Sequence, residues 1–81
     1  MSDGIDATLR RNILVVLRDL DPEEIRPGRN LEDLDANSLE RIEILSRTLE
    51  DLGLEVDPLE LRETADLGEL SALLGERKER A

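Results

Sequence analysis

A loop leads into a helix at Leu34-Asp35-Ala36-Asn37-Ser38-Leu39, and the helix continues as Glu40-Arg41-Ile42-Glu43-Ile44-Leu45. Asn37 and Glu40 have the spacing of a capping box, in which each side chain bonds the backbone N–H of the other residue. With Asn37 as the N-cap, Ser38 is the first helical residue and its hydroxyl can face solvent. Backbone N–H groups and the helix dipole favour a phosphate at such a position. This stretch predicts a helix whose first residue, Ser38, is a suitable place to attach a phosphorylated group.

An ordinary structural role for Ser38 is the alternative, because serine is among the best N-cap residues. The residue three positions beyond Ser38 is Arg41, whereas a capping box requires Glu or Gln there. The spacing therefore favours Asn37 as the cap.

Hydrophobic periodicity predicts a first helix over about residues 5–20, followed by a long loop. The predicted buried stripe of this helix is Ile5, Leu9, Ile13, Val16, Leu17 and Leu20. The segment from Asp21 to Ala36 should hold one short turn at Pro22, before Pro27-Gly28 breaks regular structure. Its apolar side chains, Ile25, Leu31 and Leu34, favour an ordered loop that is pinned to the core.

The second helix is expected over residues 38–52, because Gly53 is a typical C-terminal stop. Its predicted buried stripe is Leu39, Ile42, Leu45, Leu49 and Leu52, with Ile44 at the margin. Asp57-Pro58 should begin a short third helix that ends near Arg62.

The last helix should begin after Asp66 and weaken at Gly75, before a charged tail over residues 76–81 that is expected to fray. Its predicted inward residues are Leu67, Leu70, Leu73 and Leu74. The sequence thus predicts a single all-α domain over residues 1–81, with three main helices, a short third helix and a long loop after the first helix.

The composition of the 81 residues restricts the chemistry. Cys and His are absent, which excludes disulfides, thiolate chemistry, imidazole bases and the usual zinc sites. No nucleophile–base pair is visible, so an enzyme is disfavoured. Asp33, Asp35 and Asn37 have the spacing that opens an EF-hand loop, but Ser38 and Ile44 occupy the positions that require Gly and Glu. No metal site is predicted.

The net charge is −10, from 21 acidic and 11 basic side chains. Repulsion by phosphate groups argues against nucleic acid and anionic membranes as partners. A partner with a basic patch is favoured, although acidity that only keeps a small protein soluble is an equal alternative. The sequence has no signal-peptide pattern and no apolar run of transmembrane length, so a cytoplasmic protein is expected. We also expect it to be a monomer.

The order of the predicted elements, with Leu-x-Ala-x-Ser-Leu at a helix start and an acidic helix after it, resembles an acyl carrier protein over almost the whole chain. The resemblance implies a four-helix carrier fold, no catalytic activity, and a 4'-phosphopantetheine arm on Ser38. The arm would come from coenzyme A through a separate Mg²⁺-dependent phosphopantetheinyl transferase. Acyl groups would be held as thioesters on its thiol, so the absence of cysteine presents no difficulty.

Two residues depart from the common pattern of that family: Asn37 stands where Asp is usual, and Arg41 interrupts the acidic helix. Residues 36–44, together with Leu59-Glu60-Leu61 and Leu67-Gly68-Glu69-Leu70, are similar to the free-standing donor carriers of polyketide β-branching cassettes. This resemblance implies a short acyl group, acetyl or propionyl, loaded by an acyltransferase or decarboxylase. A 3-hydroxy-3-methylglutaryl-CoA-synthase-like partner would condense it with a β-keto intermediate on another carrier.

Two other functions compete with the donor role. One is a carrier for general fatty-acid or polyketide chain extension, and the other is an acidic helical interaction module without a prosthetic group. Modification of Ser38 separates the carriers from the interaction module.

A docking surface is expected on the second helix, where the resemblance implies contacts with basic patches of partner enzymes. Such charges set encounter rate and specificity, and the arginines among them penalise wrong partners. The predicted docking residues are Asn37, Leu39, Glu40, Arg41, Glu43, Ile44 and Arg47, with Glu50 and Asp51 as further candidates. The alternative is a solvated face with weak internal pairs, such as Glu43 with Arg47.

Overall fold

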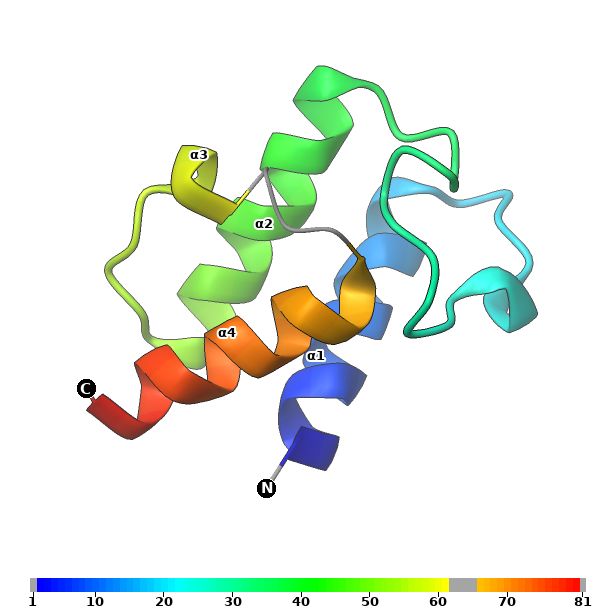
Figure 1. The fold of residues 1–81 in the computed structure, drawn as a ribbon. Coiled ribbons are helices and arrows are strands. Elements are labelled where there is room, and N and C mark those ends of the chain that lie inside the picture. The colour runs from blue at the N-terminus through cyan, green and yellow to red at the C-terminus, as the bar shows by residue number, and fades with distance from the viewer. Residues whose placement is uncertain (1, 62–65, 81) are drawn as a thin grey trace.

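The computed structural model describes residues 2–61 and 66–80 of the chain, and within these ranges every regular element is a helix (Figure 1). The elements are α1 (Ser2–Val16), the 3₁₀ turn η1 (Pro22–Glu24), α2 (Ser38–Leu52), α3 (Pro58–Leu61) and α4 (Leu67–Arg80). The prediction of an all-α fold with three main helices and a short third helix is confirmed.

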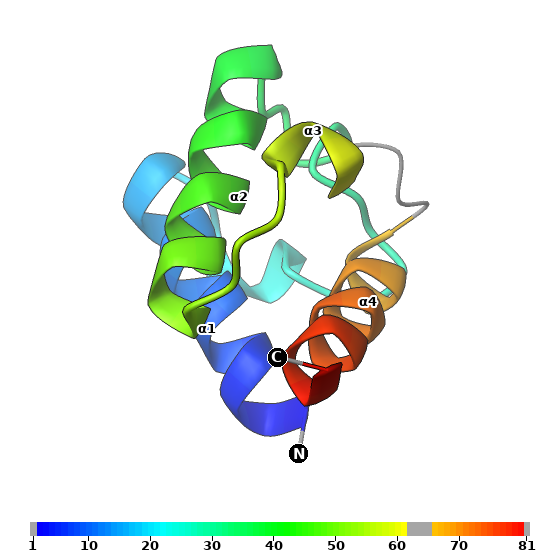
Figure 2. The same cartoon turned by 90° about the vertical axis from the view of Figure 1, so that its left-hand side faces the viewer.

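The helices pack around α1, which contacts both α2 and α4, while α3 lies against α2. Figures 1 and 2 show that the first turn of α1 and the last turn of α4 lie at one end of the molecule. Helix α2 begins at the opposite end, next to the long loop that follows α1. The start of α2 is therefore kept apart from both ends of the chain.

The core is aliphatic, and it includes the long loop as well as the helices. Ile13, Ile44 and Leu74 are fully buried at its centre, and the loop contributes Leu31 and Leu34. Loop carbonyls also accept hydrogen bonds from the first residues of α4: Leu67 N–H donates to Arg29 O at 2.7 Å, and Gly68 N–H donates to Pro27 O at 2.9 Å. These contacts confirm that the loop is ordered, because they bind it to the core and to the start of α4.

Helix α1 is shorter at its C-terminal end than predicted, since it ends at Val16 instead of Leu20. The residue before a proline is disfavoured in helical conformation, and Asp21 accordingly adopts an extended one before Pro22. A hydrogen bond from Leu20 N–H to Leu17 O closes a turn there. Leu17 and Leu20 still pack against the core from this turn, which explains why the apolar periodicity continues beyond the end of the helix.

Helix α2 has the predicted bounds, and Gly53 ends it in the left-handed conformation, with φ of 69°. Its buried face differs from the prediction. Ile44 is fully buried, whereas Leu39 is 79% exposed, because the buried face of α2 is centred on Ile44, Leu45, Thr48 and Leu49 and is turned away from Leu39. Thr48 is also fully buried, where its Oγ1 accepts a hydrogen bond of 3.2 Å from Nδ2 of Asn12 on α1. The inward face of α2 is thus centred on the contact with α1.

The last helix includes most of the charged C-terminal segment. Helix α4 runs through the charged segment to Arg80. Glu76 and Arg80 lie one turn apart on its surface and form an ion pair, with Nη2 of Arg80 2.7 Å from Oε1 of Glu76. The basic side chains in its last turn also stabilise the helix, because positive charge interacts favourably with the C-terminal end of the helix dipole. The fraying of this segment stays a prediction, and the expected end of α3 at Arg62 lies outside the described residues.

A polar cluster between α1 and α2 gives the fold a predicted pH dependence. Asp51 Oδ2 accepts hydrogen bonds from Nδ2 of Asn12 at 3.0 Å and from Nη2 of Arg11 at 2.9 Å. The bond from Asn12, and then the bond and charge of Arg11, hold the pKa of Asp51 below its ordinary value. A lowered folded-state pKa stabilises the fold above the unfolded-state pKa, and this stabilisation is lost as pH falls through the folded-state value.

We therefore expect Asp51→Asn to lose less stability than the unaltered chain when the pH is lowered through the titration range of aspartate. Urea denaturation at neutral and at acidic pH measures this difference. The matched control is Glu50→Gln, which removes one charge from the neighbouring, exposed position. Equal acid sensitivity in Asp51→Asn and the unaltered chain would contradict the assignment.

Candidate functional site

Ser38 is the first residue of α2, and its side chain is exposed to solvent. Asn37 caps the helix: its Oδ1 accepts a hydrogen bond of 2.8 Å from Glu40 N–H. In return, Asn37 N–H donates to Oε1 of Glu40 at 3.0 Å, which completes the capping box. The predicted cap is confirmed, and it leaves the hydroxyl of Ser38 free of any capping role.

The loop before Ser38 contains a left-handed residue, Asp35, between two buried residues. Asp35 has a φ of 64°, in the left-handed region that few residues other than glycine adopt. Its neighbours Leu34 and Ala36 are both buried, and Ala36 N–H donates to Leu31 O at 3.1 Å. The turn at Asp35 therefore fixes the direction in which the chain emerges at Ser38. Aspartate tolerates this conformation better than most residues, but no local sequence pattern predicts it at this position.

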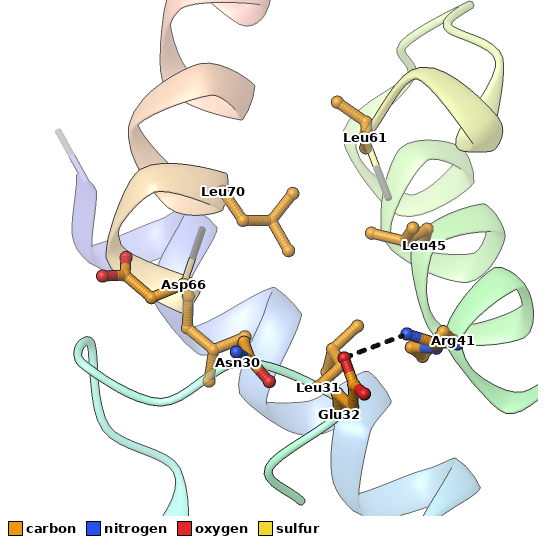
Figure 3. A pocket seen from close by; sticks show the side chains of 9 residues that line it. Asn30, Leu31, Glu32, Arg41, Leu45, Leu61, Asp66 and Leu70 are labelled. Atoms are coloured by element: carbon orange, nitrogen blue, oxygen red, sulfur yellow. Dashed lines mark ion pairs between the residues drawn. The ribbon is translucent and has the colours of Figure 1, made fainter. Parts of the chain in front are cut away.

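Arg41 lies one helical turn beyond Ser38 and contacts it. Its Nη2 donates a hydrogen bond to Oγ of Ser38 at 3.3 Å. Its Nη1 is 4.0 Å from Oε2 of Glu32 on the loop, and this ion pair is drawn in Figure 3. The guanidinium group thus lies between the serine and the loop. The sequence singled out Arg41 as an unusual residue but not its contact with Ser38.

A small cavity of about 70 Å³ lies beside Arg41 and reaches toward α3 and α4 (Figure 3). Pockets for small-molecule ligands usually measure about 300–1,000 Å³, so this cavity is small. It is lined by Asn30, Leu31, Glu32, Arg41, Leu45, Leu61, Asp66, Leu67 and Leu70.

The structure distributes the predicted docking residues unevenly. Leu39 and Glu43 are exposed on α2, and Glu40 is half-buried because it is engaged in the cap. Arg47 is also exposed, and its Nε lies 3.5 Å from Oε1 of Glu43. The prediction that Ile44 is a docking residue is wrong. Its side chain is fully buried in the core, so it cannot contact an arm or a partner.

Glu50 and Asp51, the two further docking candidates on α2, differ in their contacts. Both residues are exposed, but Asp51 also bonds Arg11 and Asn12 across the contact with α1. Asp51 therefore contributes to the contact between the two helices, and its role in docking stays a prediction.

The residues around Ser38 suit a phosphorylated attachment. Ser38 is the first residue of a helix of fifteen residues, and its exposed hydroxyl is not needed for capping. The guanidinium group of Arg41 lies beside this hydroxyl. Both the helix dipole and the guanidinium favour negative charge at this point. Among residues 2–61 and 66–80, no group of three or more carboxylates could hold a metal ion. In the same ranges, no helix is long and apolar enough to cross a membrane.

Comparison with known proteins agrees with this chemistry. Residues 7–74 match the family described as "Phosphopantetheine attachment site". The chain is similar to a polyketide biosynthesis acyl-carrier-protein, AcpK, of Bacillus subtilis (strain 168). The two are 37% identical over 70 residues, which cover 86% of this chain and 85% of the relative. No solved structure matches the chain.

Proposed function

The chain belongs to the phosphopantetheine-attachment family as an acyl carrier protein, and from this premise we propose that Ser38 carries the 4'-phosphopantetheine arm. The observation that carries the proposal is the exposed hydroxyl at the first position of α2, which the capping box of Asn37 and Glu40 leaves unused. The arm supplies a terminal thiol, on which acyl groups are held as thioesters.

The residues of the chain itself present and orient the attachment point. The capping box fixes where α2 begins, and the turn at Asp35 sets the direction of the chain just before it. The fold then acts as a tether, because a flexible arm on a small protein raises the effective concentration of its cargo at a docked enzyme. We propose no catalytic step for the chain; acyl transfer and condensation belong to its partner enzymes.

Arm attachment is tested directly by mass. The purified protein is incubated with coenzyme A, Mg²⁺ and a broad-specificity phosphopantetheinyl transferase, and its intact mass is recorded. A gain of one phosphopantetheine supports the carrier. No gain, in a reaction that modifies a known carrier, contradicts the proposal and favours the acidic helical interaction module.

For the pathway, we propose a polyketide carrier that donates a short acyl group for β-branching by a 3-hydroxy-3-methylglutaryl-CoA-synthase-like enzyme. Similarity to a polyketide biosynthesis carrier supports the pathway class. Asn37 and Arg41, the two departures from the common motif, support the donor role. General chain extension is the competing role.

The donor role predicts that Arg41→Glu impairs condensation while the arm remains attached. Reversal of this charge gives α2 the uninterrupted acidic face of common carriers, and the synthase-like enzyme must discriminate against such carriers. We expect the kcat/KM of the synthase-like enzyme for the acylated carrier to fall about tenfold or more, which corresponds to about 1.4 kcal/mol.

The measurement uses carriers that mass spectrometry shows to be fully modified and acylated. Arg77→Glu, which makes the same charge reversal at an exposed position on α4 outside the predicted docking residues, is the matched control. Equal kcat/KM values for Arg41→Glu and the unaltered carrier would contradict the donor role and favour the competing role in general chain extension.

A further inference from the structure

Building on the proposed attachment at Ser38, we propose that Arg41 is a positioning residue that binds the phosphodiester of the arm. In this arrangement the guanidinium gives up its long contact with Glu32 and bonds the phosphate oxygens. The base of the arm is then held on the side of α2 that faces the loop.

The position of the guanidinium is the first support. Nη2 of Arg41 lies 3.3 Å from Oγ of Ser38, which is the atom that bonds the phosphorus when the arm is attached. The unesterified oxygens of the phosphate are only one further bond away, so they lie within the reach of the same side chain. Residues three apart on a helix are neighbours on its surface, and this brings Arg41 to the serine without a backbone change.

The restraint on the side chain is the second support. The side chain of Arg41 is only 33% exposed, and it lines the cavity together with Leu45. An arginine whose methylene stem packs on apolar residues keeps its charged end at the surface. Part of the rotamer freedom is therefore already lost, and less entropy is lost when the phosphate binds.

The charges are the third support. The present ionic partner of Arg41 is Glu32, at 4.0 Å and with an 80% exposed side chain, and such exposed pairs contribute little. A phosphodiester is ionised at all physiological pH values, and guanidinium groups bind phosphate oxygens in paired hydrogen bonds. The N-terminal end of α2 favours the same negative charge. The phosphate therefore replaces Glu32 as the stronger partner.

The other arginine of α2 serves as a comparison. Arg47 is nine residues beyond Ser38 and pairs with Glu43 at 3.5 Å, so it does not reach the phosphate. With Arg41 on the loop side of the arm, the exposed side chain of Leu39 stays available to a partner enzyme.

The test is ³¹P NMR of the arm-bearing protein in three forms: unaltered, Arg41→Gln and Arg47→Gln. Each form is first shown by intact mass to carry one phosphopantetheine. We expect Arg41→Gln to shift the ³¹P resonance and lower its transverse relaxation rate, because the phosphate gains freedom when the guanidinium is removed. Arg47→Gln should match the unaltered protein, and added salt should move the unaltered protein toward Arg41→Gln.

A second readout uses only the unaltered protein. The Nε–Hε resonance of Arg41 should shift when the arm is attached, while that of Arg47 should not. An unchanged Arg41 resonance, or identical ³¹P spectra in all three forms, would overturn the inference even though the mass shows the arm in place. A failure of the arm to attach at all would instead overturn the proposed function, so the two failures are distinguishable.

Discussion

Replacement of Ser38 by alanine should abolish arm attachment completely, so that the intact mass stays at that of the unmodified chain after incubation with coenzyme A and a phosphopantetheinyl transferase. Alanine has no oxygen to accept the phosphopantetheinyl group. The fold should persist, because Asn37 and Glu40 form the cap between themselves. Alanine is also the best helix former, and the hydrogen bond lost from Arg41 is exposed, so we expect a stability change within about 1 kcal/mol.

The matched control for this substitution is Ser46→Ala, on the same helix and two turns further along. Ser46 is half-buried and away from the cap, and its variant should be modified as fully as the unaltered protein. Circular dichroism of both variants checks that the helices remain. A mass gain that survives in a folded Ser38→Ala protein would place the arm on another residue and refute the attachment site.

The start of α2 could be predicted from the sequence because its signals are local. Asn37 and Glu40 bond each other's backbone within a single turn, and Gly53 ends the helix through its own backbone freedom. Neither signal depends on distant residues. The candidate attachment point, Ser38, could be identified for the same reason.

The rotation of α2 could not be read in the same way. Its apolar residues allow more than one buried stripe, and the choice between Leu39 and Ile44 depends on where α1 lies. The hydrogen bond between Asn12 and Thr48, 36 residues apart in sequence, helps to fix that contact. Sequence periodicity contains no information on a polar pair of this kind.

The contact between Arg41 and Ser38 lies between these two cases. The spacing of three residues makes it possible on any helix. The guanidinium lies on the side that faces Glu32 and the cavity, which Leu45 also lines. Glu32 belongs to the loop that contains the left-handed turn at Asp35, and no pattern in the sequence predicts the path of that loop.

The observed rotation of α2 predicts very different costs for two identical substitutions on this helix. Leu45 is 1% exposed, whereas Leu39 is 79% exposed. Truncation of a buried leucine to alanine loses transfer free energy and leaves a cavity, at a cost of about 2–5 kcal/mol. The total stability of such small domains is only about 5–15 kcal/mol, so Leu45→Ala should lower the midpoint of urea unfolding strongly or unfold the chain.

Leu39→Ala is the matched control, because it removes the same atoms from the same helix. We expect it to change the free energy of unfolding by no more than about 0.5 kcal/mol, since its side chain loses little burial. Any difference between the two variants reports their burial and not helix propensity, which the substitutions alter alike. Equal destabilisation by both would mean that Leu39 faces the core, as the hydrophobic periodicity alone suggests. Leu39 would then be lost as an apolar contact for partner enzymes beside Ser38.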